Sequence, residues 1–332
     1  MDSLTQIILG AAVGEVVLGK KIGNKAMLYG AIAGTIPDLD VLASFFTDTV
    51  SALEIHRGFT HSIFFSVLFA PVFAYIVTRF ESYKNLKDWC WLFFWAFITH
   101  PILDTQTTWG TQLFWPLDIR LAFKNVFVVD PLYTIPFLIF LLLAMRQKKD
   151  TKKRRLYTNL GLIISSSYLV LTLLLKGLAY QKFTTELALQ EINYKAINTK
   201  PTPLNTVLWS ANVATENSYL IGYASFLDKN PIQFSEYPKN HELLGALAKH
   251  PKMKRMIAIS KGWYTINKKN EHLYFNDLRF GALSMQPNAS NFVFKYKIEV
   301  ASDGTPFFIE EAKKKDDGKK LLSDLWRRIK GN

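Results

Sequence analysis

Long apolar stretches fill the first half of the chain and alternate with short polar segments. They cover residues 4–19, 26–46, 62–78, 89–106, 130–145 and 156–176. Several approach the roughly 20 apolar residues that a helix needs to cross a bilayer. The first and fifth stretches are short, and the second is interrupted at Ile36-Pro37-Asp38. We therefore expect six helical segments, of which some are tilted, re-entrant or only half-membrane.

The second half of the chain, from Ala179 onward, has the pattern of a soluble domain. Alternating or β-branched aromatic stretches predict antiparallel strands. These stretches are residues 205–213, 261–269, 272–280 and 292–300. We expect a helix near 241–256 and a basic amphipathic helix over 318–332. The predicted fold is a multi-pass α-helical membrane domain (1–177) followed by a smaller α+β soluble domain (178–332).

The net charge of +13 suggests nucleic acid as a partner until the positions of the charges are considered. Three Lys or Arg residues follow the first apolar stretch, three follow the third and seven follow the fifth, whereas the loops after the second and fourth hold only Arg57, Arg120 and Lys124. Basic loops stay on the cytoplasmic side of a membrane. This pattern predicts a membrane protein with an extracytoplasmic C-terminal domain and no nucleic-acid partner.

Polar residues unusual for a membrane segment fall at the ends of the stretches that this topology places outside the cytoplasm. The six are Asp38, Asp40, His56, His61, His100 and Asp104. They include half of the six histidines of the chain. The predicted topology brings all six to one face of the bilayer.

Each part of this set has a plain alternative. His100 and Asp104 are four residues apart, which places an imidazole and a carboxylate on one helix face. His56 and His61 suit a turn through Gly58, although an interfacial loop with solvated histidines has the same pattern. The two aspartates could cap a helix or pair with Arg57, yet carboxylates near hydrocarbon are costly unless paired or bound to a cation.

Taken together, the six residues predict a divalent metal site with nitrogen and oxygen ligands. Cys90 is the single cysteine, so a thiolate-rich site is excluded. These ligands favour zinc, with manganese or iron as alternatives, and their number allows one ion or two. A bound metal activates water at neutral pH, so hydrolysis is the expected reaction, with Asp38 or Asp104 as the general base.

Further residues near this face are candidates for substrate binding. Arg57 could bind a phosphate or carboxylate group. Trp109 and Trp115 could line a headgroup pocket, although aromatic anchoring at the interface is the commoner role. Asp130 could support the site or cap a helix. Glu15 lies deeper in the first stretch, where pairing with a basic residue such as Lys20 is the simpler role.

Five motifs occur in a specific order: MDSLTQIILGAAVGE, GAIAGTIPDLDVL, HRGFTHS, THPILDTQTTWGTQLFWPLDIR and VVDPLY. Over roughly residues 1–145 the chain resembles the YdjM-like, membrane-bound metal-dependent hydrolases of bacteria. The resemblance implies hydrolase activity and an inner-membrane location, and the six His and Asp residues fall on that family's metal-binding positions. Gln6 stands where many such proteins carry a histidine, and it could orient water or substrate instead. A more distant likeness to zinc-dependent phospholipase C suggests phosphoesters.

These observations predict extracytoplasmic, metal-dependent hydrolysis of a lipid-associated or phosphoester substrate, with membrane lipid as the partner. A transporter is the main alternative, because intramembrane Asp and His residues also mark ion pathways. Transporters, however, place such groups near the midplane and often show internal repeats. A third class is a non-catalytic anchor that presents the C-terminal domain.

Overall fold

The computed structural model describes residues 1–285, 289, 291–312 and 318–331. Two structural units divide the chain, and each takes residues from more than one segment. The helical unit holds residues 1–46, 55–174 and 203–205, and the C-terminal unit holds residues 47–54, 175–202 and 206–332. The first unit is helical with apolar helices, and the second is rich in β-sheet, as the sequence predicts.

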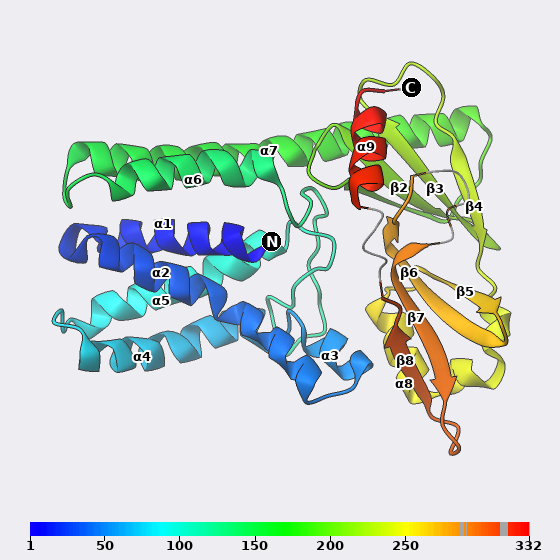
Figure 1. The fold of residues 1–332 in the computed structure, drawn as a ribbon, viewed down its shortest axis with the longest axis horizontal. Helices are drawn as coiled ribbons and strands as arrows, with labels where there is room; N and C mark the ends of the chain where they lie inside the picture. The colour runs from blue at the N-terminus through cyan, green and yellow to red at the C-terminus, as the bar shows by residue number, and fades with distance from the viewer. Residues whose placement is uncertain (286–288, 290, 313–317, 332) are drawn as a thin grey trace. The chain divides into compact units, whose positions relative to one another are not determined.

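Each of the six apolar stretches contains helix (Figure 1). In chain order the elements are α1 (Ser3–Ile22), α2 (Asn24–Thr35), η1 (Pro37–Phe45), α3 (Thr49–Ile55), η2 (Phe59–His61), α4 (Ile63–Phe80), α5 (Leu86–Asp104), α6 (Pro131–Met145) and α7 (Lys152–Leu189). The predicted interruption of the second stretch occurs where Pro37 begins the 3₁₀ helix η1, bent by 41° from α2. Proline suits the first position of a helix because a backbone N–H at that position would have no acceptor within the helix, so its absence costs nothing.

Within the described residues, three helices are long and apolar enough to cross a membrane, namely α1, α4 and α7. The bent pair of α2 and η1 raises this number to four if it forms one broken span. Helix α6 is apolar but has only 15 residues, in agreement with the short fifth stretch of the sequence, whereas α1 has 20 residues, so the first stretch was wrongly predicted to be short. The structure thus supports apolar helices throughout the N-terminal half and membrane-length helices in part of it.

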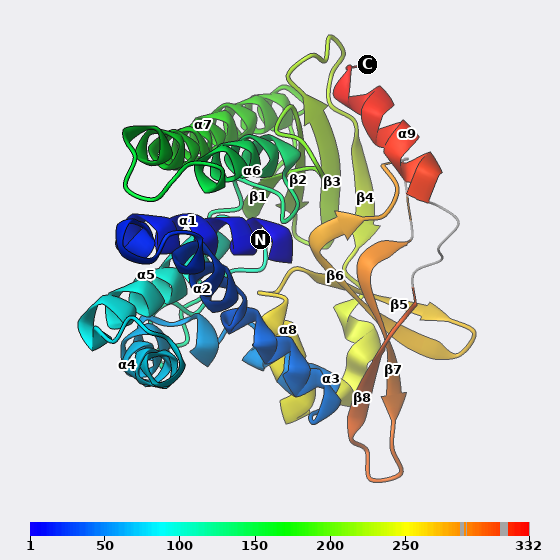
Figure 2. The same ribbon diagram turned by 60° about the vertical axis from the view of Figure 1, so that its left-hand side comes forward.

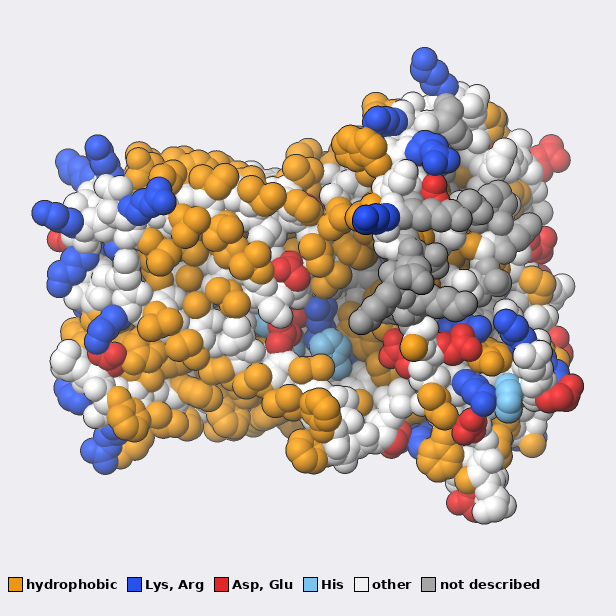
Figure 3. All heavy atoms as spheres, viewed as in Figure 1, with side chains coloured by type: hydrophobic (Ala, Val, Ile, Leu, Met, Phe, Trp, Pro, Cys, Tyr) orange, Lys and Arg blue, Asp and Glu red, His pale blue; other side chains and the backbone are white. Residues whose placement is uncertain are grey.

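Basic residues gather at one end of the helical unit. The turns from α1 to α2, from α4 to α5 and from α6 to α7 all lie at this end, and Figure 3 shows Lys and Arg side chains clustered over it. The surface between this end and the other is mainly hydrophobic in the same view. The helical unit therefore separates a basic end from the end where η1, η2 and the last turn of α5 lie.

Glycines allow α1 and α2 to pack with their backbones in direct contact. A Cβ atom on Gly30 of α2 would lie 2.1 Å from the carbonyl oxygen of Gly10 in α1. A Cβ on Gly14 would lie 2.1 Å from the carbonyl oxygen of Ala26. Small residues at such crossings are typical of helices that pack in membranes.

We expect Gly30→Ala to destabilise the helical unit by about 1–3 kcal/mol, because the added methyl overpacks a backbone contact. Gly177→Ala, in the part of α7 that belongs to the C-terminal unit, is the control for a helical glycine without a close contact, since a Cβ there would meet nothing within 4 Å. The control should be neutral or slightly stabilising, as alanine is the better helix former. Thermal unfolding in detergent measures both variants, and equal melting temperatures would contradict the proposed close contact.

The C-terminal unit contains two four-stranded antiparallel sheets, of orders β1-β2-β3-β4 and β5-β6-β7-β8 (Figure 2). Their strands are β1 (Ala196–Pro201), β2 (Leu208–Ala214), β3 (Ser218–Ser225), β4 (Phe234–Pro238), β5 (Tyr264–Lys269), β6 (His272–Ala282), β7 (Phe292–Val300) and β8 (Pro306–Glu310). The four predicted strand segments are confirmed as β2, β5, β6 and β7. The predicted helix near 241–256 is present as η3 (His241–Lys249) and α8 (Pro251–Ile259), and the basic tail forms α9 (Gly318–Ile329). Of the tail, Asn332 lies outside the described residues.

Residues 47–54 form an excursion from the N-terminal half of the chain into the C-terminal unit. Val50 of α3 is fully buried in a core with Met253, Met256 and Phe275. The guanidinium group of Arg255 also donates hydrogen bonds to both carboxylate oxygens of Glu54. The division of the chain into an apolar and a polar half does not predict this exchange, because it says nothing of one short polar helix.

Candidate metal site

Three local structures supply the polar residues at the end of the helical unit opposite the basic turns. His100 and Asp104 lie one turn apart at the C-terminal end of α5. Asp38 and Asp40 occupy the first turn of η1, immediately after the bend at Pro37. His61 ends the 3₁₀ turn η2, just before Ser62 caps α4 by accepting a hydrogen bond from the Phe65 N–H.

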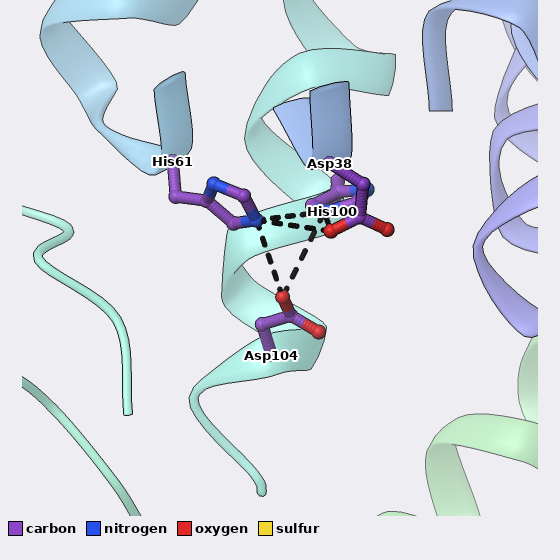
Figure 4. Close-up of side chains that lie close together, drawn as sticks. All are labelled: Asp38, His61, His100 and Asp104. Carbon is purple, nitrogen blue, oxygen red and sulfur yellow. Dashed lines mark hydrogen bonds and ion pairs between the residues drawn. The ribbon is translucent and has the colours of Figure 1, made fainter. Parts of the chain in front are cut away.

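Four side chains from these structures converge on one point (Figure 4). They are Asp38, His61, His100 and Asp104, and one ligand atom from each lies within 4.8 Å of the other three. Nε2 of His61 lies 3.1 Å from Nε2 of His100. Both imidazole nitrogens lie 3.4 Å from Oδ1 of Asp38. Oδ2 of Asp104 is 3.4 Å from His61 Nε2 and 3.7 Å from His100 Nε2.

The outward nitrogen of each imidazole is held by an oxygen acceptor. Nδ1 of His100 donates to the carbonyl oxygen of Gly34 over 2.7 Å. Nδ1 of His61 lies 3.3 Å from Oδ2 of Asp40. Such contacts fix the ring orientation and leave the lone pair of Nε2 directed at the shared point, as they do for metal-binding histidines.

Burial makes this arrangement costly unless positive charge compensates it. His61, His100 and Asp104 are at most 1% exposed, whereas the side chain of Asp38 is 26% exposed. Burial by itself lowers the pKa of His61, but its carboxylate partners, Asp104 first among them, raise that pKa to about 10. The site therefore favours a proton or a cation at its centre, and Asp38 lies on its open side.

The donor set fits a divalent ion of the zinc type. Zinc bonds of about 2.0–2.2 Å in a tetrahedron place ligand atoms roughly 3.3–3.6 Å from one another. Five of the six separations between the ligand atoms are 3.1–3.7 Å and span this value, and the carboxylate oxygens of Asp38 and Asp104 lie within 4.8 Å of each other. Oδ2 of Asp104 is also buried and accepts no hydrogen bond from the described residues, although Nε of Arg57 lies 3.0 Å away as an ion pair. Two imidazoles and two carboxylates would hold one such ion.

Asp40 and His56, the other two predicted ligands, lie beside this cluster. Nδ1 of His56 is 3.0 Å from Oδ1 of Asp40. Oδ2 of Asp40 accepts the backbone N–H of Arg57 over 2.7 Å and lies 3.3 Å from the Thr60 hydroxyl, which donates to it. The carboxylate of Asp40 thus joins the turn around His56 to His61.

Arg57 is 5% exposed and engaged inside the site. Its Nη1 donates to Oγ1 of Thr107 over 2.7 Å, and its Nε forms the ion pair with Asp104. Its backbone adopts a left-handed φ of 57°, which costs a non-glycine residue about 1–2 kcal/mol. This conformation is maintained where the Arg57 N–H donates to Asp40, so local strain accompanies the alignment of the site.

The remaining predicted residues have varied surroundings. Nε2 of Gln6 donates to Oδ1 of Asp104 over 2.9 Å, and the amino group of Met1 pairs with the same carboxylate. The ring of Trp109 lies 5.4 Å from that of His56. Trp115 packs against Phe59.

Two acidic residues named from the sequence lie apart from the cluster. Asp130 caps α6 by accepting the N–H groups of Leu132 and Tyr133. Glu15 pairs with Arg154 instead of Lys20. Both therefore have the plain structural roles that the sequence analysis left open for them.

Some contributors to the site are not evident from residue type alone. Thr60, Thr107 and the carbonyl group of Gly34 hold Asp40, Arg57 and His100 in place. The two threonines lie within motifs that carry the family resemblance, HRGFTHS and THPILDTQTTWG, and this was the available signal. The carbonyl group has no sequence signal, because any residue could supply it.

Comparison with known proteins gives two matches. A family profile described as YdjM inner membrane protein matches residues 1–181. The chain is also similar to a protein of Escherichia coli (strain K12) named Inner membrane protein YbcI, with 33% identity over 100 residues. That alignment covers 30% of this chain and 57% of the relative, so the chain spans little more than half of the relative's length. No solved structure matches the chain.

Proposed function

The chain belongs to the YdjM inner membrane protein family, which confirms the resemblance inferred from its motifs, and from this membership and the His/Asp cluster we propose a metal-dependent hydrolase of the bacterial inner membrane. The convergence of Asp38, His61, His100 and Asp104 is the observation that carries the proposal. A structural role alone would not require two imidazoles and two carboxylates to point at one buried centre.

The side chains of the cluster would have two roles, metal binding and proton acceptance. His61, His100 and Asp104 are fully enclosed and would hold the ion together with Oδ1 of Asp38. A bound divalent ion acts as a Lewis acid that lowers the pKa of a water molecule and polarises a phosphoryl oxygen. Asp38 is the member open to solvent, so its Oδ2 would accept the proton of the attacking water.

Lipid-associated phosphoesters are the proposed substrates. The segment η1, which carries Asp38 and Asp40, also exposes large apolar side chains. Leu39, Val41 and Phe45 are 54%, 56% and 78% exposed. Such side chains suit contact with acyl chains, and a headgroup held beside them would lie next to Asp38. Trp109, beside His56, would border the headgroup.

The charges of the helical unit support an extracytoplasmic site. The three basic turns favour the cytoplasmic side, and the His/Asp cluster lies at the other end of the same helices (Figures 1 and 3). Helix α7 starts at the basic end and continues for 38 residues, or about 57 Å at 1.5 Å per residue. This length exceeds the roughly 30 Å of a hydrocarbon core, so we also expect the C-terminal unit outside the cytoplasm.

Hydrolysis of phosphoesters by the purified full-length chain tests the proposal. The protein, loaded with zinc, manganese or iron, is incubated with phosphatidylglycerol and phosphatidylethanolamine vesicles and with a soluble phosphodiester, and products are identified by mass spectrometry. We expect metal-dependent turnover that is lost in His100→Ala. His272→Ala, on the exposed end of β6, is the matched histidine control.

Two results would oppose hydrolysis. Protein that retains a stoichiometric metal but converts none of the substrates would contradict the proposed reaction. Metal uptake into proteoliposomes that depends on His100 and Asp104, without turnover, would favour a transporter. The position of the cluster at one end of the helices makes that outcome the less expected one.

A further inference from the structure

A second polar site lies at the basic end of the helical unit, between α1 and α7. It is a cavity of about 230 Å³ whose lining includes Glu15, Lys20, Asp150, Arg154 and Arg155. The proposed hydrolase site uses none of these residues. The volume is below the roughly 300–1,000 Å³ of pockets that enclose drug-sized ligands, so it suits a small polar group.

The floor of this cavity is formed by a buried, bidentate ion pair between Glu15 and Arg154. The guanidinium group of Arg154 donates from Nε and Nη2 to the two carboxylate oxygens of Glu15, and from Nη1 to the carbonyl oxygen of Gln147. Arg154 is 3% exposed and Glu15 is 8% exposed. A Cβ on Gly19 would lie 2.2 Å from Oε2 of Glu15, so this glycine leaves space for the carboxylate. The charges of the floor compensate each other.

The rim, in contrast, carries charged side chains that form no ion pair among the described residues. Lys20, Asp150 and Arg155 are exposed, and none of them forms an ion pair with a residue in the described part of the chain. Thr151 lines the cavity beside the first turn of α7, where the helix dipole favours negative charge. Two cations and one carboxylate therefore border a single small cavity.

From this charge arrangement we propose that the cavity binds the headgroup of phosphatidylethanolamine. Lys20 and Arg155 bind the phosphate, and Asp150 binds the ammonium group. Val16 also lines the cavity and is 59% exposed, so apolar surface for the acyl chains adjoins it. The bound lipid bridges the first helix to the last helix of the membrane unit.

Lipid binding to the full-length, delipidated protein in detergent tests this site. The ligands are phosphatidylethanolamine, phosphatidylglycerol, phosphatidylcholine and, as soluble probes, phosphoethanolamine and inorganic phosphate. Native mass spectrometry gives the binding and thermal unfolding gives the stabilisation. We expect phosphatidylethanolamine to bind most tightly, since its ammonium group can donate hydrogen bonds to Asp150 whereas a choline group cannot.

Three variants distinguish the proposed contacts from a general electrostatic attraction of lipid to the basic surface. Lys20→Gln/Arg155→Gln should weaken binding of both phosphatidylethanolamine and phosphatidylglycerol roughly tenfold or more. Asp150→Asn should remove only the preference for phosphatidylethanolamine, and asparagine tolerates the left-handed φ of 64° at this position. Lys152→Gln/Lys153→Gln is the control, because it removes two charges from the same turn of α7 outside the cavity lining and should leave the preference intact.

Each remaining outcome would overturn the proposal. Equal loss in the control and in Lys20→Gln/Arg155→Gln would indicate a diffuse basic surface. An unchanged preference in Asp150→Asn would remove the headgroup assignment. Stabilisation by phosphoethanolamine or inorganic phosphate equal to that by the lipid would identify a site for soluble phosphate.

Discussion

Metal affinity is expected to fall by about 100- to 1,000-fold in His61→Ala and His100→Ala. Structural zinc sites provide roughly 10–16 kcal/mol, and one of four ligands accounts for about 3–4 kcal/mol of it. Both imidazoles are buried and their Nε2 atoms are 3.1 Å apart at the shared centre, so each alanine removes one ligand atom from it. Elemental mass spectrometry after dialysis against a graded chelator series measures the affinity.

A graded set of controls makes this result specific. His56→Ala should weaken binding by only about 10- to 100-fold, because His56 contacts Asp40 and not the shared centre. His272→Ala, on an exposed strand end, should bind as wild type. The melting temperature of each apoprotein shows whether it folds. Equal affinities in all four variants would contradict a metal centre at this position, whereas loss in His272→Ala as well would indicate adventitious binding.

The sequence predicts the parts of the site that depend on local geometry. His100 and Asp104 converge because residues four apart share a helix face, and that spacing is readable from the chain. The break at Pro37 is likewise local, since proline suits the start of the new helix. By contrast, the turn at residues 56–61 decides which histidine points inward. The backbone path of this turn depends on Asp40, Thr60 and the left-handed conformation of Arg57. The sequence alone therefore could not show that His61, and not His56, points to the centre of the site.

Pairings between residues far apart in the sequence could not be predicted either, because they depend on the tertiary fold and not on local spacing. Glu15 pairs with Arg154, 139 residues away, although Lys20 is much closer in sequence. Residues three and four apart are neighbours on a helix surface and a lysine at i+5 is not, whereas α7 brings Arg154 directly to the carboxylate. The membership of α3 in the C-terminal unit is a similar case, because Val50 is buried among residues more than 190 positions later.

The buried pair of Glu15 and Arg154 leads to the second large prediction. We expect Arg154→Leu to lower the stability of the helical unit by about 3–5 kcal/mol, because it leaves an uncompensated carboxylate inside the packed helices. The double variant Glu15→Leu/Arg154→Leu should recover most of this loss, since two apolar side chains remove the buried charge altogether. Lys25→Leu is the matched control at the same end. Lys25 is mainly exposed where it pairs with Glu81, so breaking this ion pair should cost less than about 1 kcal/mol.

Unfolding of the four proteins by titration with sodium dodecyl sulfate in mixed micelles measures these differences. Recovery in the double variant would assign the loss in Arg154→Leu to the unpaired Glu15 carboxylate. Equal destabilisation of the single and double variants would instead assign it to the bond from Arg154 to the Gln147 carbonyl group, or to packing. Metal binding distinguishes this effect from damage to the His/Asp cluster. The pair lies at the other end of α1 from Gln6, so Arg154→Leu protein that remains folded should bind metal as tightly as wild type.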